Sequence, residues 1–150
     1  MEKLQYKIRI NASKKKVWQT MLNSETYKKW VKAFSPHSQF IGEWKQGAHI
    51  KFIDPDMGGT KAVLEEVKPY DRLHAKHVAI INQNGSEDTE SDVAKNWMGI
   101  TETYVLNEAD GVTELSIDIL SHKDFVKMFD DCWPRALELL RGLCEKDDKG

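Results

Sequence analysis

The first part of the chain alternates between apolar and polar side chains and then changes to helical spacing. From Leu4 to Ile10 every second side chain is apolar, and this period of two is typical of a half-buried β-strand. Ser13 and Ser24 are each placed to cap a helix. The apolar side chains after each cap share one helical face: Val17, Trp18, Met21 and Leu22, then Tyr27, Trp30 and Val31. The pattern predicts one strand followed by two short helices.

Strand-like runs fill the middle of the chain and are separated by turn-forming residues. The runs cover residues 37–44, 48–54, 60–68, 72–82, 96–107 and 111–120. Gly, Pro, Asn and Asp cluster between several of them, and these residues favour turns. Because connections this short join antiparallel strands, we expect an antiparallel sheet. The acidic segment 85–92 is expected to be an exposed loop.

The last part of the chain has the spacing of a long amphipathic helix. Apolar side chains recur every three or four residues from Phe125 to Leu143, after a Ser121–Asp124 segment that resembles a capping box. Pro134 lies inside this pattern and removes one backbone hydrogen bond, so we expect a kink or a split near residues 130–131. One long helix covering one face of a sheet gives an α+β, two-layer arrangement.

Composition narrows the class of protein. The chain has 150 residues, of which 40 % are hydrophobic and 31 % charged, and we expect residues 1–150 to form one domain. The net charge of −2 argues against nucleic acid as a partner, and no apolar run approaches the roughly 20 residues of a membrane span. Cys132 and Cys144 would lie about 18 Å apart on one helix, too far for a disulfide. Because the first residues also lack an apolar secretory signal, we expect a cytoplasmic protein with free thiols.

Several side chains occur in an order and spacing that mark a known fold. They span nearly the whole chain and comprise Val17, Trp18, Leu22, Trp30, Phe40, Gly42, Gly47, the segment 65–69, Leu73, Gly111, Thr113, Trp133, Leu137 and Leu140. With these markers the chain resembles the helix-grip fold of START and Bet v 1-like proteins, the SRPBCC superfamily. Within it, the chain is most similar to the domain named for the activator of heat-shock-protein-90 ATPase.

This resemblance implies a particular architecture and range of functions. It implies a curved antiparallel sheet, of about seven strands if the first strand and the six runs are counted, with two short helices after strand one and a long C-terminal helix. Members of the superfamily mostly bind hydrophobic ligands between the sheet and the long helix. Some are cyclases or aromatases, and many have no known activity.

The chain shows no recognisable cofactor or metal motif. Gly58-Gly59 is the only glycine pair, and it lacks the context of a phosphate-binding loop. His74 and His77 are three residues apart on a predicted strand, so they point to opposite faces. No three ligating side chains share a face at zinc-ligand spacing, and we therefore predict no cofactor and no bound metal.

We also assign no catalytic residue from the sequence. Glu65 and Glu66 are adjacent on a predicted strand and point to opposite faces, and the chain has no nucleophile motif. His77 shares its parity with Leu73, Ala75, Ala79 and Ile81. The five histidines are expected at the surface or at the edge of the core. The alternative, for His77 alone, is that this parity turns it inward, where it would supply a polar group to a ligand site.

A strongly curved sheet and one helix pack well at the centre and poorly at one end. The gap must be filled by large side chains, a ligand or a void. Ten residues are candidates to line it: Trp30, Phe34, Phe40, Trp44, His77, Ile81, Trp97, Phe129, Trp133 and Leu137. These residues either enclose a ligand cavity or fill the space themselves.

We therefore predict binding of a small apolar molecule, lipid-like or aromatic, in a cavity between the sheet and the final helix. One alternative is an enzyme of the cyclase or hydrolase type that uses His77 or an acidic residue in the same cavity. The other alternative is a chaperone-interaction module. It would depend on the lysines at positions 14–16, 28, 29 and 32, in a segment where residues 1–35 hold nine basic and two acidic side chains.

Overall fold

A computed structural model, which describes residues 1–146, shows strands and helices in the predicted order. The helices are α1 (Lys14–Leu22), α2 (Ser24–Trp30), α3 (Asp92–Trp97) and α4 (Val126–Glu145), with 3₁₀ turns η1 (Val31–Ala33) and η2 (Lys123–Phe125). The strands are β1 (Glu2–Ile10), β2 (Gln39–Ile41), β3 (His49–Asp54), β4 (Gly58–Lys68), β5 (Arg72–Ile81), β6 (Glu87–Asp88), β7 (Thr101–Ala109) and β8 (Val112–Ser121).

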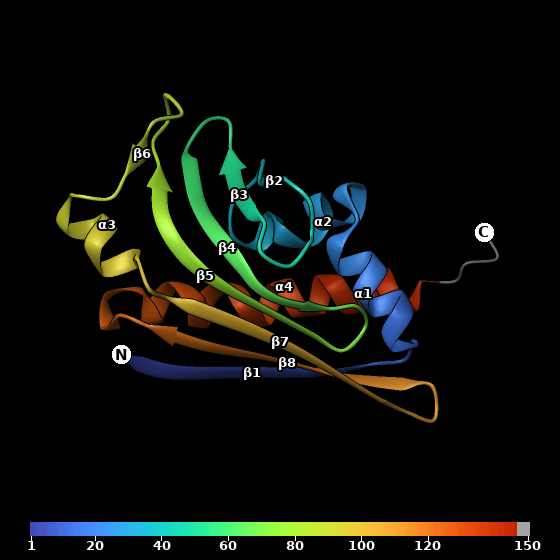
Figure 1. The fold of residues 1–150 in the computed structure, drawn as a ribbon. Coiled ribbons are helices and arrows are strands. Elements are labelled where there is room, and N and C mark those ends of the chain that lie inside the picture. The colour runs from blue at the N-terminus through green and yellow to red at the C-terminus, as the bar shows by residue number, and fades with distance from the viewer. Residues whose placement is uncertain (147–150) are drawn as a thin grey trace.

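The strands form one antiparallel sheet in the order β1-β8-β7-β5-β4-β3-β2, and the short strand β6 pairs with β5. Figure 1 shows β3, β4 and β5 bending around α4, with α1 and α2 near the end of α4 and α3 near its beginning. This is the α+β helix-grip arrangement that the sequence predicted. Among the described residues, no helix is both long enough and apolar enough to cross a membrane.

The core lies between the sheet and α4. From α4 it receives the buried side chains of Phe129, Trp133, Ala136, Leu137, Leu140 and Cys144. Alternation along the strands supplies the other half, because Leu115, Ile117 and Ile119 of β8 are all buried on one face. Trp18 is buried as expected, and both cysteines are free.

The two short N-terminal helices form as predicted, with one change of cap. Ser13 accepts a hydrogen bond from the Lys16 backbone N–H at 3.1 Å, as expected of an N-cap. The second cap is Asn23 and not Ser24, because the Asn23 side-chain oxygen accepts from the Glu25 N–H at 2.9 Å. Ser24 is instead the first residue of α2.

Two predicted strands are shorter than expected. The run 37–44 is a strand only over Gln39–Ile41, because Gly42, with a φ of +129°, turns the chain away at the sheet edge. The run 96–107 begins inside α3 and becomes β7 only at Thr101. Ser91 caps α3 by accepting from the Ala94 N–H at 3.2 Å. The acidic segment 85–92, expected to be a loop, contains β6 and this cap.

The predicted split of the last helix is wrong. α4 runs without interruption from Val126 to Glu145 and contains Pro134. Pro134 lies on the exposed side, while Trp133 and Ala136 continue the buried face past it. Nor does Ser121 form a capping box: it is fully buried at the end of β8, and His122 caps η2 by accepting from the Asp124 N–H at 3.1 Å.

Candidate functional site

A cavity of about 790 Å³ lies between the curved part of the sheet and α4. Its walls come from the ends of α1 and α3, from α2, from strands β3, β4, β5 and β7 with their adjoining loops, and from the first half of α4. Most of the lining is aliphatic or aromatic, with Met21, Leu73 and Phe129 as buried examples. Large side chains therefore fill only part of the predicted gap.

The structure places eight of the ten candidate residues in the wall of this cavity. They are Trp30, Phe34, Trp44, His77, Ile81, Trp97, Phe129 and Trp133. Phe40 and Leu137 do not line it. Phe40 packs edge-on against Tyr27, with ring centroids 5.0 Å apart, and Leu137 is buried in the core further along α4. Both side chains are therefore used in packing against neighbouring elements, and they do not face the open space.

Trp133 is the centre of the aromatic wall. Its ring lies 5.1 Å from Phe34, 5.9 Å from Trp30 and 5.9 Å from Tyr104, measured between centroids. Two of these contacts, with Phe34 and Tyr104, are edge-to-face, a favoured arrangement of aromatic rings. Trp30 is fixed further by its indole N–H, which donates to the Met21 carbonyl at 3.1 Å. The wall is therefore held in place by its own contacts.

A short chain of polar side chains lies within this apolar wall. His77 Nε2 is 2.8 Å from Glu102 Oε2, and the Tyr104 hydroxyl donates to Glu102 Oε1 at 2.7 Å. All three side chains line the cavity. His77 is 3 % exposed, so of the two positions considered for it the structure shows the inward one, which its strand parity allowed. His74, of opposite parity, bonds instead to Thr103.

Burial and hydrogen bonding oppose each other at Glu102. Burial raises the pKa of its carboxyl group, but the hydrogen bond and charge of His77 and the Tyr104 hydroxyl outweigh this, and the pKa is lowered. Glu102 is thus held ionised inside the apolar wall. Burial, together with the Glu102 charge, raises the pKa of Tyr104 well above its ordinary value, so Tyr104 remains a hydrogen-bond donor.

Glu102 and Tyr104 were not among the predicted site residues. They share strand parity with Ile100 and Leu106, which are both buried. Alternation along the strand therefore indicated that Glu102 and Tyr104 face inward. A carboxylate is expected on the exposed face of a strand, so its residue type argued against an inward position. Only the pairing of β5 with β7 brings Glu102 beside His77.

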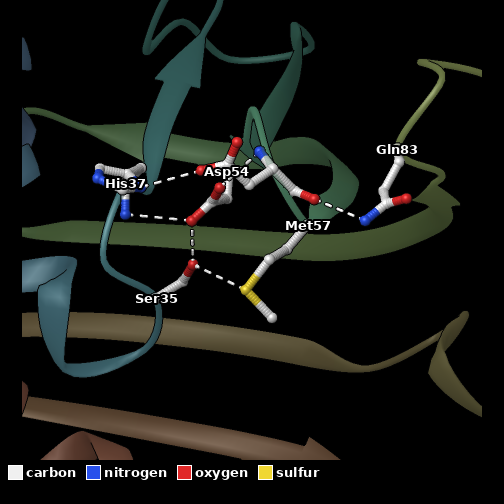
Figure 2. A network of polar contacts seen from close by, with 6 residues as sticks. Ser35, His37, Asp54, Met57 and Gln83 are labelled. Carbon is white, nitrogen blue, oxygen red and sulfur yellow. Dashed lines mark hydrogen bonds and ion pairs between the residues drawn. The ribbon is translucent and has the colours of Figure 1, made fainter.

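A second polar cluster, the rim cluster, joins three loops at the edge of the cavity (Figure 2). It consists of Ser35, His37, Asp54, Asp56, Met57 and Gln83. At its centre Asp54 accepts from the Ser35 hydroxyl, from the His37 N–H at 3.1 Å and from the Asp56 N–H at 2.8 Å. Gln83 donates to the Asp56 carbonyl at 2.6 Å. The rim cluster thus ties β3 to the chain before β2 and after β5.

The rim cluster differs from the expectation that no three potential metal ligands come together. Ligand atoms of His37, Asp54 and Asp56 lie within 4.8 Å of one another, so three potential metal ligands do converge. In this arrangement Asp54 is occupied by three hydrogen-bond donors. His37 Nδ1 faces Asp56 Oδ2 at 3.2 Å, and both side chains are mostly exposed.

Comparison with known proteins places the fold. No family model matches the chain, and no curated protein matches it. Solved structures do: protein MLL2253 from Mesorhizobium loti has a TM-score of 0.78 at 12 % identity, covering 98 % of this chain and 99 % of that one. The Aha1 dimer from Colwellia psychrerythraea has a TM-score of 0.74 at 19 % identity, covering 99 % of each chain. Protein CV1439 from Chromobacterium violaceum has a TM-score of 0.72 at 15 % identity, covering 97 % and 98 %.

These likenesses establish the fold. The chain has the helix-grip fold and is similar in fold to the Aha1 dimer, so the resemblance drawn from the sequence markers is confirmed at the level of fold.

Proposed function

We propose that this protein binds a small hydrophobic ligand in the cavity between the sheet and α4. The observation that carries this proposal is the cavity itself, at about 790 Å³ with walls rich in aromatic and aliphatic side chains. Ligand pockets are typically about 300–1,000 Å³, mostly apolar, with a few polar groups. The His77–Glu102–Tyr104 chain supplies such groups. An open apolar space of this size also costs stability, and a ligand that fills it recovers lost contacts.

Two measurements test this proposal. Native mass spectrometry of the purified protein is expected to reveal a co-purified apolar molecule. Tryptophan fluorescence is expected to change when sterols, aliphatic amphiphiles or polyketide-like aromatics are added, because Trp30, Trp44, Trp97 and Trp133 line the cavity. The proposal fails if no member of this panel binds below about 1 mM, which corresponds to only about 4 kcal/mol.

A matched pair of variants locates the binding. Ala75 lines the cavity and is 4 % exposed, so Ala75→Leu is expected to fill part of the space and weaken binding about tenfold or more. Lys76→Leu places the same side chain on the exposed face of the same strand and is expected to leave binding unchanged. Equal affinity in both variants would place the ligand elsewhere.

Catalysis is a second candidate function, favoured by the His77–Glu102 pair. A carboxylate that accepts from one imidazole nitrogen fixes the tautomer and orients the ring, which is how a general base is prepared. His77 Nδ1 is buried and has no hydrogen-bond partner among the described residues. Turnover of an ester or a polyketide-like substrate should then be lost in His77→Gln and kept in His74→Gln, whose imidazole bonds to Thr103 on the other face. Retained turnover in His77→Gln would exclude this role.

Chaperone interaction stays a prediction from the N-terminal lysines. At least two of them have partners within the chain, because Lys14 pairs with Asp71 at 2.5 Å and Lys28 with Glu25 at 3.6 Å. A pull-down with a purified chaperone, compared with a variant in which Lys29 and Lys32 are replaced by Gln, would test it. Binding that is unchanged by these replacements would contradict a role for this surface.

A further inference from the structure

Among the described residues, the wall of the cavity holds negatively charged side chains but no lysine or arginine. Its lining includes two carboxylates, Glu102 and Asp54, and the imidazole of His77. Asp54 is buried, at 4 % exposed, and Glu102 is partly buried, with its side chain 13 % exposed. In such surroundings charges are screened less than at the protein surface.

Glu102 keeps its charge through one hydroxyl and one imidazole. Its carboxylate accepts from Tyr104 and contacts His77 Nε2. Neither partner carries the permanent positive charge of a lysine or arginine side chain. Because part of the side chain remains exposed and lines the cavity, a ligand group can reach this charge.

Aromatic rings surround the same region. Tyr104 packs against Trp133 with centroids 5.9 Å apart, and Tyr27 lies 6.4 Å from Trp44. All four line the cavity. The faces of tryptophan and tyrosine rings attract cations. An anionic head group, by contrast, would meet Glu102 and Asp54 without a lysine or arginine of the described wall to pair with.

From this charge distribution we infer that the cavity selects an apolar molecule carrying a single cationic amine, with the ammonium beside Glu102, over one carrying a carboxylate. This inference rests on the proposed function, because it concerns the ligand of the same cavity. It separates hydrophobic amines from fatty acids, which the apolar lining alone does not distinguish.

Three probes with the same ten-carbon chain test it: decylamine, decanol and decanoate, titrated near pH 7 by calorimetry below their micelle concentrations. At that pH the amine is cationic and the acid anionic. We expect decylamine to bind about tenfold or more tightly than decanol, the range of a hydrogen bond to a charged group. Decanoate is expected to bind most weakly.

Two variants assign the selectivity to Glu102. Glu102→Gln keeps the size of the side chain and is expected to abolish the preference for amine over alcohol, with folding checked by thermal melting. Glu114→Gln is the matched control, because it removes the same charge from the other face of the neighbouring strand β8. It is expected to keep the preference.

The outcomes separate the two proposals. Equal binding of the three probes, tightest binding of decanoate, or an unchanged preference in Glu102→Gln would overturn the amine inference and leave ligand binding standing. If none of the probes and no member of the wider panel binds below about 1 mM, the proposed function fails and this inference fails with it.

Discussion

Asp54 illustrates how one buried carboxylate organises the edge of the cavity. It accepts hydrogen bonds from the backbone N–H groups of His37 and Asp56 and from the Ser35 hydroxyl. These bonds stabilise the ionised form, so the pKa of Asp54 lies below its ordinary value of 3.8, with the Ser35 hydroxyl as the largest cause. The stabilisation is present above the unfolded pKa and is lost as the pH falls through the folded pKa.

Asp54→Asn is therefore expected to lower the free energy of unfolding at pH 7, and the deficit relative to wild type should shrink as the pH drops below about 3.8. Urea denaturation at pH 7 and at the lowest pH where the protein stays folded measures this. Asp56→Asn, at a side chain 74 % exposed, serves as the control with a small effect at either pH. A deficit for Asp54→Asn that does not change with pH would contradict the assignment.

Two glycines are expected to respond oppositely to alanine. A Cβ on Gly59 would lie 1.9 Å from the Phe52 carbonyl oxygen and 2.8 Å from the Ile53 Cα, both backbone atoms of β3. Gly59→Ala should therefore force the strands apart and cost about 3 kcal/mol or more.

At Gly142, inside α4, an added methyl group would meet no atom within 4 Å outside the helix's own backbone. Gly142→Ala is expected to stabilise by about 1 kcal/mol. Chemical denaturation of both variants measures the contrast, and a neutral Gly59→Ala would show that the strands can separate.

At the scale of the element, α4 tolerates a proline because its buried face is continuous. Proline cannot donate to the carbonyl four residues before it, here Asp130, and its ring crowds that carbonyl. Phe129, Trp133, Ala136 and Leu137 nevertheless stay buried on both sides of the exposed Pro134. Packing of the apolar face thus outweighs the missing bond.

Pro134→Ala is expected to stabilise the protein by up to about 3 kcal/mol, because the helix does not restart at the proline and the bond is regained. In a thermal melt this corresponds to roughly 2–4 °C per kcal/mol for a chain of this length. Arg135→Ala, at the neighbouring exposed position, is the control and should change stability by less than about 0.5 kcal/mol. A destabilised Pro134→Ala would mean that the proline sets a bend the core requires.

At the scale of the whole molecule, the curvature of the sheet creates the cavity. β5 is paired with β4 through two register shifts, between Lys61 and Ala62 and between Leu64 and Glu66. Such irregularities bend strands, and Figure 1 shows β4 and β5 curving around α4. A straight helix cannot follow this curve along its full length, so the space beside Trp133 stays open.

A ligand in this space should raise the melting temperature. At a free ligand concentration about 100 times the dissociation constant the stabilisation is about 2.7 kcal/mol, or roughly 5–11 °C at this chain length. Ala75→Leu is expected to melt with a reduced ligand-induced shift, while Lys76→Leu keeps the full shift. A ligand that binds without raising the melting temperature would have to bind the unfolded chain as well.

Local periodicity by itself determined much of this molecule. Alternation in β1 and β5 and the three-and-four spacing of α4 indicated which side chains face the core. The parity of β5 put His77 on the same face as Leu73 and Ala75, which are buried. The order of elements was enough to predict an α+β, two-layer arrangement, because each element's pattern depends only on backbone geometry. The resemblance carried by the marker residues added the helix-grip fold.

Contacts between distant segments decided the rest. Glu102 lies beside His77 only because β5 pairs with β7, and Asp54, His37 and Asp56 converge only because three loops meet. Whether an aromatic residue reaches the cavity, as Trp133 does and Phe40 does not, depends on the curvature of the whole sheet. Strand register and curvature arise from the combined packing of all elements, and no periodicity within one segment encodes them.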